Sequence, residues 1–501
     1  MQIVDAKIEG RYKRIRNILL LGGLLYVLPV ILANRYYNDD LARSLYGATG
    51  WNGDGRPLAE SIMLFVSGGE PLTDISPLPL LMAVVVLAMV LTVYAKKNLS
   101  FCENATCVAM ALLFILVQPF TMAGISYKYD CLFMFLAVSI PFLLFSLNES
   151  IPLWIYVGLS ALSGVMVMSM YQAAFGMFLI LELIQFYLWM QTQRGTFRQY
   201  LKTEIPRFAG IMVGALLYVV VIAPRFVDAA GWRNEAARMS LGPNMGTITN
   251  ILRNIKRGLT YQYSVLQGTS KYYSGSIILL CLLTVIAIGI RWWKGKHDVK
   301  GSLLAVVFII LPFAAVVSVY LPMTVLSSFD TKYRVFLCFG GALLLLAVTA
   351  MGAFQNKCKI LMVIMGLCLF FQYSCVYSYG NALKCQKEYE EYTVQQVAHD
   401  LETVNAEKEY HAVSFLGNAP RARQLQKICE KYPFFNEIVP VYVSNDTWIG
   451  GAWVYHYLQY DLEICASDDT DLAVVQEQTP VLKNALYDCY VNGEKIVVRW
   501  K

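Results

Sequence analysis

Two adjacent carboxylates, Asp39 and Asp40, follow the first apolar segment of the chain, residues 18–33. A carboxylate can act as a general base that removes the proton of a hydroxyl while the hydroxyl oxygen attacks carbon. Charged groups are costly to place beside a bilayer and are typical of a functional site there. The alternative is a helix cap, because Asp is a favoured cap residue and Leu41 and Leu45 follow at helical spacing.

Cations, a third carboxylate and a tryptophan follow this pair: Arg43, Trp51, Asp54 and Arg56. Arginine binds phosphate through strong charge-assisted hydrogen bonds, so both arginines are candidate phosphate ligands. Alternatively, they form salt bridges with Asp40 or Asp54. The Trp51 ring can stack on a sugar, or it can belong to an interfacial belt of aromatic residues. Together these residues predict a site for a polar, anionic substrate attached to lipid.

Three later segments add candidate residues for binding a donor phosphate or sugar. They are Lys128 and Asp130 in the loop 124–130, Tyr171 and Gln172 in a turn between two spans, and Lys332 and Arg334 before an apolar span. The cations can stabilise a leaving phosphate, or they can form ion pairs and reach lipid headgroups. Tyr171 and Gln172 can hydrogen-bond a sugar or satisfy the backbone of their own turn.

Membrane-spanning helices must position these residues. The chain has 501 residues, of which 57% are hydrophobic and 15% charged, and its mean hydropathy is +0.49. Soluble proteins have about 45–50% apolar and about 25% charged residues. Eleven apolar segments of about 17–19 residues are long enough to cross a bilayer. They are residues 17–33, 78–95, 107–123, 131–147, 152–169, 172–190, 208–224, 276–292, 302–320, 334–352 and 360–378.

The charge pattern predicts the orientation of these spans. Basic residues precede the first span and recur in alternate short loops, which places the N-terminus in the cytoplasm by the positive-inside rule. The loop 225–275 on the other side is also basic, but long loops carry less weight. We therefore expect a membrane domain, 1–380, with a first outer loop, 34–77, that holds a short interfacial helix at 58–66. An extracytoplasmic α/β domain, 381–501, follows.

Within the C-terminal segment, Val394, Val397, Leu401 and Val404 form a helical stripe. Strands are predicted at 411–415 and 438–443, and a hairpin at 487–491 and 494–500 around Asn492-Gly493. Outside the cell, one or two disulfides could join four cysteines of this segment. They are Cys385, Cys429, Cys465 and Cys489.

Other features exclude several classes of protein. The chain has no Walker, G-x-S-x-G or H-E-x-x-H motif and no C-x-x-C pair, so we expect no ATP-driven pump, serine hydrolase or metal site. The basic residues indicate topology and contacts with membrane lipids and give no indication of nucleic-acid binding. Glu182 is an intramembrane carboxylate, for which we expect a structural hydrogen bond with Gln185.

Three segments carry a resemblance to a known family. They are Tyr37-Asn38-Asp39-Asp40-x-x-Arg43, Gly50-Trp51-x-x-Asp54-Gly55-Arg56-Pro57-Leu58 and Leu72-Thr73-Asp74-Ile75-Ser76-Pro77-Leu78-Pro79. They resemble the serotype-converting O-antigen glucosyltransferases of the Gtr type II family, as does the turn Tyr171-Gln172-Ala173-Ala174. The resemblance implies a GT-C-like membrane glycosyltransferase of the bacterial cytoplasmic membrane. It carries the catalytic role to Asp39 and Asp40 without deciding which of the two is the base.

The resemblance also implies a polyprenyl-phosphate sugar, commonly undecaprenyl-phosphate glucose, as the donor. The acceptor would be a cell-surface polysaccharide or its lipid-linked precursor. We expect inverting transfer of one sugar on the outer face. Mg²⁺ or Mn²⁺ could bind the paired carboxylates, but a monophosphate donor needs a metal less than a diphosphate does. The alternatives are a polysaccharide polymerase or ligase and a transporter of lipid-linked sugars.

Overall fold

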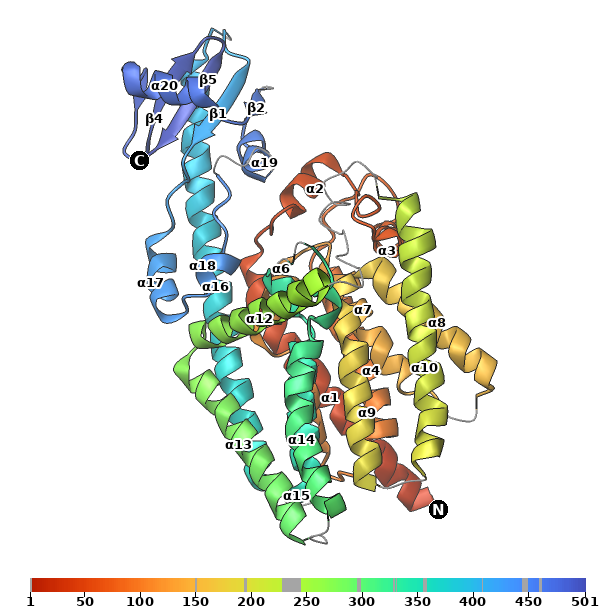
Figure 1. The fold of residues 1–501 in the computed structure, drawn as a ribbon. Coiled ribbons are helices and arrows are strands. Elements are labelled where there is room, and N and C mark those ends of the chain that lie inside the picture. Colours follow the sequence, from red (N-terminus) through yellow and green to blue (C-terminus); the bar gives the residue numbers. More distant parts are fainter. Residues whose placement is uncertain are drawn as a thin grey trace.

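The computed structural model is a bundle of helices with a small mixed sheet beyond one end (Figure 1). The N-terminus lies at the opposite end of the bundle from this sheet. The structure describes residues 2–148, 151–192, 196–227, 245–294, 299–327, 329, 331–354, 358–407, 409–443, 449–458 and 462–501.

Among these described residues, eight helices are long and apolar enough to cross a membrane. They lie in α1 (Gln2–Ala33), α4 (Leu78–Asn98), α8 (Leu153–Met170), α9 (Gly176–Thr192), α10 (Phe197–Leu217), α13 (Lys271–Lys294), α15 (Phe339–Phe354) and α16 (Lys359–Val404). Two shorter apolar helices lie among them, α7 (Cys131–Leu144) and part of α14 (Val299–Ser318). Ten of the eleven predicted segments therefore form helices, which confirms a polytopic, mainly helical membrane protein.

The prediction of a continuous span at 107–123 is wrong. Helix α5 (Ala105–Leu113) ends early, and a 3₁₀ turn, η1 (Pro119–Thr121), leads into α6 (Met122–Ser126). Proline lacks an N–H and disfavours helical backbone in the preceding residue, and Gln118 is accordingly extended, with φ −161°. The Gln118 side chain donates to the carbonyl of Leu337 at 3.1 Å and accepts from the N–H of Phe120 at 2.8 Å. Polar backbone groups at this break are thus satisfied inside the protein, as a membrane requires.

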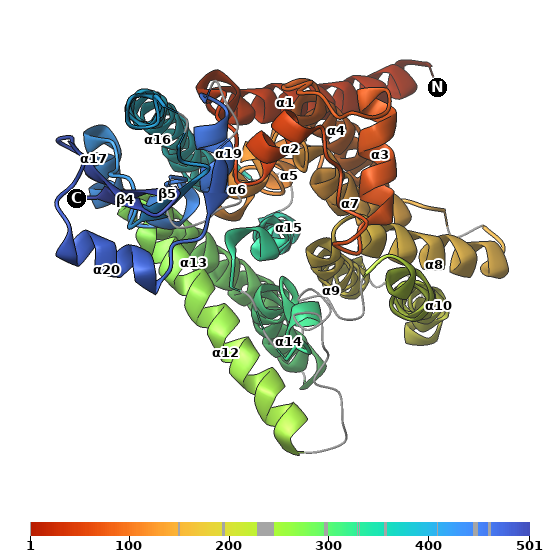
Figure 2. The same cartoon turned by 90° about the horizontal axis from the view of Figure 1, so that it is seen from above.

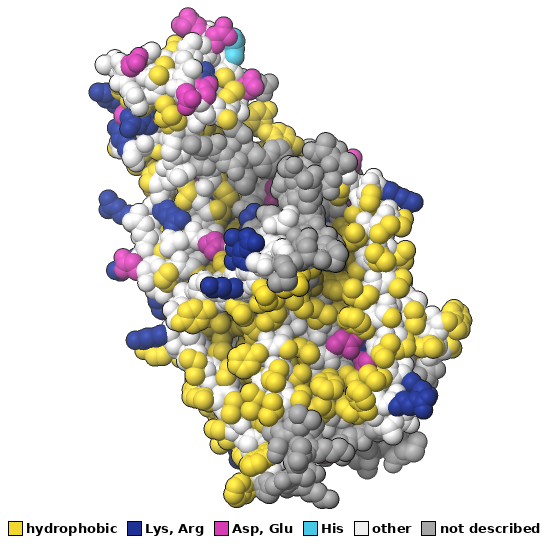
Figure 3. Space-filling model, in the orientation of Figure 1, with side chains coloured by type: hydrophobic (Ala, Val, Ile, Leu, Met, Phe, Trp, Pro, Cys, Tyr) yellow, Lys and Arg dark blue, Asp and Glu magenta, His cyan; other side chains and the backbone are white. Residues whose placement is uncertain are grey.

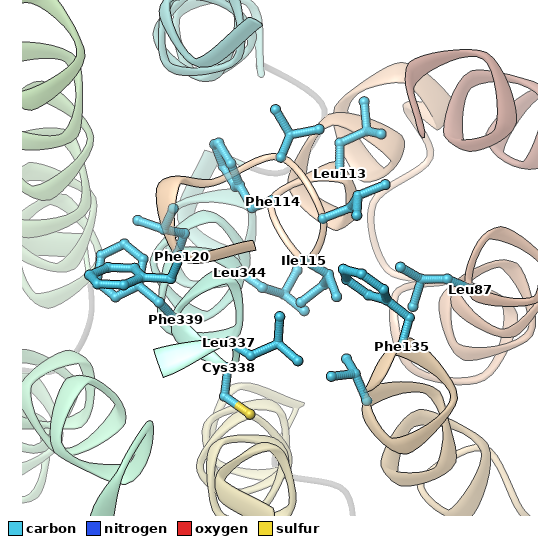
Figure 4. Close-up of a cluster of buried hydrophobic side chains, with 14 of the residues drawn as sticks. Leu87, Leu113, Phe114, Ile115, Phe120, Phe135, Leu337, Cys338, Phe339 and Leu344 are labelled. Atoms are coloured by element: carbon cyan, nitrogen blue, oxygen red, sulfur yellow. The ribbon is translucent and has the colours of Figure 1, made fainter. Parts of the chain in front are cut away.

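This broken segment packs in the centre of the bundle. Figure 4 shows Phe114 and Phe120, on either side of the break, beside Leu337, which precedes α15, and beside Phe339 and Leu344 of α15. Most of α15 is buried, whereas the outer helices expose many apolar side chains. Hydrophobic side chains also cover most of the described bundle surface in Figure 3, while charged ones gather on the C-terminal domain. This apolar surface suits a lipid environment.

Three helices lie at the end of the bundle nearest the sheet: α2 (Asp40–Tyr46), α3 (Pro57–Ser67) and α12 (Met245–Gly268). Helix α3 confirms the short helix predicted at 58–66. The sequence analysis missed α12, which crosses the ends of α13 and α14 and extends outward when the molecule is viewed from above (Figure 2). Its apolar residues are spaced for a surface helix and not for a span.

Helix α16 continues beyond the bundle and carries the C-terminal elements, so the domain boundary expected at 380 falls inside one helix. The sheet has the order β2-β1-β5-β4-β3, in which β1 is parallel to β2 and β5 and the other pairs are antiparallel. Its strands are β1 (Ala412–Leu416), β2 (Glu463–Cys465), β3 (Leu482–Lys483), β4 (Tyr487–Asn492) and β5 (Lys495–Trp500). The predicted hairpin is confirmed as β4 and β5.

Helices α17 (Arg423–Lys431), α18 (Phe435–Ile438), α19 (Ile449–Tyr455) and α20 (Asp469–Glu477) complete this part. The strand predicted at 438–443 is wrong, because these residues leave α18 without strand pairing. The segment instead runs beside the first outer loop, where the Ile438 carbonyl accepts a hydrogen bond from Tyr37 at 3.2 Å. All four cysteines considered for disulfides, Cys385, Cys429, Cys465 and Cys489, are free thiols.

Candidate functional site

The segment that carries the paired carboxylates is held between the bundle and the C-terminal domain. Arg35 Nη2 lies 2.7 Å from Glu390 Oε2 of α16, and both side chains are buried. The Arg35 guanidinium also lies 4.6 Å from the ring centre of Tyr442. On α2, Leu41 belongs to the same buried cluster as Trp453 of α19. The C-terminal domain therefore fixes the position of the short helix on which the carboxylates lie.

The two carboxylates have different environments. Asp40 is fully buried, and its Oδ2 accepts the backbone N–H groups of Tyr37 at 3.1 Å and Lys128 at 2.8 Å. Its Oδ1 has no hydrogen-bond partner among the described residues. Burial, reinforced by the charge of Asp39, raises the pKa of Asp40 well above its ordinary value. Asp40 is thus suited to holding the loop together.

Asp39 is accessible and forms an ion pair. Its side chain is 30% exposed, and Oδ2 accepts from Arg43 Nε at 3.2 Å and Nη2 at 2.8 Å. Although Asp39 precedes α2, its side chain makes no capping hydrogen bond, so the capping alternative does not describe this carboxylate. Arg43 also donates to the Thr49 carbonyl and lies 4.0 Å from the ring centre of Trp51.

A cavity of about 560 Å³ opens beside Asp39. This volume is within the range of small-molecule sites, about 300–1,000 Å³. Its lining residues are Asp39, Arg43, Gly47, Ala48, Thr49, Gly50, Asp54 and Glu70. The carboxylates and the arginine give it a polar wall suited to hydroxyl groups. The sequence analysis missed Glu70, although it lies in the same outer loop between two of the motifs that carry the family resemblance.

Trp51 links this wall to a more deeply buried carboxylate. The ring, which we expected either to stack on a sugar or to lie in an interfacial belt, is fully buried beneath Arg43. Its Nε1 donates to Asp130 Oδ1 at 2.8 Å, and Asp130 Oδ2 lies 3.9 Å from Arg56 Nη1. Burial and then repulsion by Asp39 raise the pKa of Asp130, against the opposing effect of Arg43 and Arg56.

Arg56 extends the network towards the later candidates. Its guanidinium lies 5.2 Å from the ring centre of Tyr171, whose hydroxyl donates to the Arg334 carbonyl at 2.9 Å. Arg334 Nη1 in turn donates to the Tyr127 hydroxyl at 2.7 Å. The Arg56 Nε is buried without a hydrogen-bond partner among the described residues. Lys332 is exposed.

Gln172 and Tyr218 hold the turn that precedes Arg56. Gln172 Nε2 donates to the Gly55 carbonyl at 3.2 Å, and the Tyr218 hydroxyl donates to the same oxygen at 2.6 Å. Gly55 has φ +71°, and a Cβ there would lie 2.7 Å from the Tyr218 hydroxyl, so glycine is required at this position. Gln172 therefore binds the backbone of the first outer loop, whereas the alternative in the sequence analysis was that it satisfies the backbone of its own turn.

Lys128 forms an ion pair away from Asp39. Its Nζ lies 2.7 Å from Asp74 Oδ2 and donates to Asn34 Oδ1 at 2.8 Å. It also lies 4.0 Å from the ring centre of Tyr36. These contacts connect the two ends of the first outer loop and match the alternative of an interfacial ion pair.

The carboxylates of the cavity do not form a cluster suited to a divalent ion. In the described parts of the chain, no three Asp, Glu, His or Cys side chains at this cavity bring their donor atoms within 4.8 Å of one another. Mg²⁺ and Mn²⁺ require several oxygen ligands around one point.

These observations define a multi-pass membrane protein with a polar, carboxylate-lined site at one end of its helical bundle. A family model described as "Glucosyl transferase GtrII" matches residues 28–345, a range that includes all the candidate site residues. The chain belongs to this family, as the motifs of the first outer loop predicted, and this makes it a glucosyltransferase related to O-antigen modification.

The chain is also similar to a protein of Salmonella phage P22, printed as "Uncharacterized 55.3 kDa protein in gtrB 5'region". The two are 28% identical over 493 residues, which cover 95% of this chain and 96% of the relative. No solved structure gives a significant match.

Several site residues were not predicted from the sequence. Asn38 Nδ2 donates to the Tyr127 hydroxyl at 2.6 Å, and Tyr218 binds Gly55 from a distant helix. Asn38 has φ +52°, a conformation that Asn adopts more readily than most residues. That preference was a usable signal, whereas nothing in the local sequence identified Tyr127 or Tyr218.

Proposed function

We propose that this glucosyltransferase moves a single glucose from a polyprenyl-phosphate donor to a cell-surface polysaccharide or its lipid-linked precursor, with inversion. The observation that carries the proposal is Asp39, an accessible carboxylate that lines the cavity while its neighbour Asp40 is buried. Two neighbouring carboxylates in different environments commonly have different roles.

Asp39 acts as the general base. It removes the proton of an acceptor hydroxyl while that oxygen forms a bond to C1 of the donor sugar. The bond between C1 and the phosphate oxygen breaks, and the electron pair leaves with the polyprenyl phosphate. Attack on the face opposite the phosphate inverts C1. Arg43 positions Asp39 through its two hydrogen bonds.

Arg56 is the proposed ligand of the donor phosphate. A lipid phosphate is a stable anion that needs no acid to leave, so electrostatic stabilisation is the main requirement. The unpaired Nε of Arg56 and the N-terminus of α3, which begins one residue later, both favour an anion at this place. Arg334, Asp130, Trp51, Tyr171 and Gln172 hold this part of the site in place through the contacts described above.

We further propose that this end of the bundle faces out of a bacterial cytoplasmic membrane. The basic N-terminal segment lies at the opposite end, which the positive-inside rule assigns to the cytoplasm. An outward-facing site suits an acceptor polysaccharide at the cell surface. The division into a membrane domain, 1–380, and an extracytoplasmic domain, 381–501, remains part of this proposal.

Transfer by the purified protein in detergent tests the mechanism. Wild type, Asp39→Asn and Asp40→Asn are given polyprenyl-phosphate glucose and the acceptor, with nucleotide-linked glucose as the control donor. We expect Asp39→Asn to lower the rate about 10²–10⁴-fold, the range for a lost general base. Asp40→Asn should keep most of the activity, because the amide oxygen can accept the same backbone N–H groups.

Full transfer by Asp39→Asn would refute the assignment of the base. Use of nucleotide-linked glucose would refute the donor class, and a ladder of repeat units in place of one added sugar would indicate a polymerase.

A further inference from the structure

Three cysteines that are far apart in the sequence meet at the end of the bundle opposite the candidate site. Cys102 follows α4, Cys107 lies in α5 and Cys358 precedes α16. Their sulfur atoms all lie within 4.8 Å of one another, and all three side chains are buried. The absence of a C-x-x-C pair gave no sign of this cluster, because the fold brings the third cysteine from more than 250 residues away.

We propose that this cluster binds one soft cation, Zn²⁺ or Cu⁺, through three thiolates. Metal–sulfur bonds of about 2.3 Å place neighbouring sulfurs about 4 Å apart, so only small side-chain shifts are needed. Among the described residues, no fourth Cys, His, Asp or Glu joins the group. A buried set of sulfur ligands selects thiophilic ions over Mg²⁺ or Ca²⁺. The proposal does not depend on the transfer reaction.

The surroundings hold the cluster in place and supply positive charge. Arg11 of α1 donates to the Cys102 carbonyl and, at 3.2 Å, to the Leu99 carbonyl. The Arg11 Nε is buried without a hydrogen-bond partner among the described residues, so a negatively charged group nearby would stabilise it. The Asn104 side chain accepts the Cys107 N–H at 3.0 Å and fixes the start of α5. Three thiolates and one bound cation would leave a negative charge beside this guanidinium.

The proposed orientation places the cluster at the cytoplasmic face, where thiols remain reduced. Each thiol releases its proton to water as its sulfur binds the ion, so no oxidant or reductant is required. The bound ion would connect the loop between α4 and α5 to the start of α16. Because the sulfurs are buried, the ion must enter during folding or through local opening of this loop.

Metal analysis of the full-length protein tests the proposal. The protein is produced in medium supplemented with a zinc salt or, separately, with a copper salt, purified in detergent with a non-thiol reductant, and analysed by mass spectrometry of its metals. We expect about one ion per chain in wild type. Cys102→Ser and Cys358→Ser should lose it, whereas the matched control Cys368→Ser, a buried cysteine of α16 outside the cluster, should retain it.

The X-ray absorption spectrum of the metal in the wild-type protein provides a test that needs no variant, should the serine variants fail to fold. A first shell of sulfur at about 2.3 Å is expected. The proposal would be overturned by a shell of oxygen or nitrogen, or by metal contents in wild type no higher than in Cys102→Ser. It would also be overturned by a Cys102–Cys107 disulfide, detected as thiols that resist alkylation until they are reduced.

Discussion

The buried ion pair between Arg35 and Glu390 should determine whether the catalytic segment stays attached to the C-terminal domain. Replacing Glu390 with leucine leaves the Arg35 guanidinium buried without its counter-charge, which costs about 3–5 kcal/mol when a buried pair is broken on one side. The Glu390 Oε1 also accepts hydrogen bonds from Gln386 at 3.1 Å and from the Tyr442 N–H at 3.2 Å, and these are lost too. This energy corresponds to about a 10²–10⁴-fold rise in local opening.

The double variant Arg35→Met/Glu390→Leu distinguishes two contributions to stability: the contribution of the ion pair itself, and the penalty for leaving one buried charge unpaired. Because apolar residues of similar size often replace a buried pair without loss, the double variant should recover most of the stability. Glu388→Leu is the matched control on the same helix, since the Lys384–Glu388 pair is 58% and 62% exposed and contributes at most about 1 kcal/mol.

Hydrogen exchange at residues 35–46 and at α19 measures the opening, and glucose transfer measures its consequence. Glu390→Leu should raise exchange in both segments together and lower transfer, while the control should change neither. The reasoning fails if Glu390→Leu exchanges no faster than Glu388→Leu, or if the double variant is as unstable as the single one.

Three further predictions concern stability and are measured by thermal unfolding in detergent. The folded-state pKa of Asp40 is raised above the value of about 3.9 expected in the unfolded chain. The stability that this group contributes is therefore present below about pH 4, and it is lost as the pH rises through the folded-state pKa. Asp40→Asn should remove this decline of stability with rising pH. Parallel pH profiles of the unfolding midpoint in wild type and Asp40→Asn would contradict the prediction. Gly55→Ala should lower the free energy of unfolding by at least about 1–2 kcal/mol, because alanine is strained at φ +71° and its Cβ would meet the Tyr218 hydroxyl. Removing that hydroxyl with Tyr218→Phe should restore part of the lost stability. An unchanged unfolding midpoint in Gly55→Ala would show that the turn can relax. Arg207→Met should lower the free energy of unfolding by about 3 kcal/mol, because Arg207 Nε and Nη2 bind Glu182 at 3.1 and 3.2 Å. Full stability in this variant would mean that Glu182 is neutral or solvated.

Local sequence signals correctly predicted those helices and hairpins whose formation depends on the residues of the element itself. The pattern around Asn492-Gly493 specified a hairpin, and Pro57 together with the spacing of apolar residues specified α3. The span predicted at 107–123 failed for a local reason as well. Pro119 was visible in the sequence, but average hydrophobicity outweighed its effect on the backbone of Gln118.

Partners that come from distant parts of the chain were harder to predict. Glu182 was expected to bind Gln185, one turn away, but it pairs with Arg207 of the next helix, while Gln185 donates to Asn98 at 2.7 Å. Neighbours along one helix are visible in a sequence, whereas contacts between helices depend on how the helices are rotated and packed. The three clustered cysteines were missed for the same reason.

The difference between Asp39 and Asp40 follows from their adjacency. Consecutive residues at the start of a helix point about 100° apart, so two neighbouring side chains cannot face the same surroundings. On α2, Leu41 is buried against the C-terminal domain, and Asp40 is directed into the loop, where two backbone N–H groups bind it. Asp39 is left on the side of the cavity. The packing that fixes the rotation of α2 therefore also decides which carboxylate can reach a substrate. This makes the C-terminal domain part of the site, although none of its described residues lines the cavity.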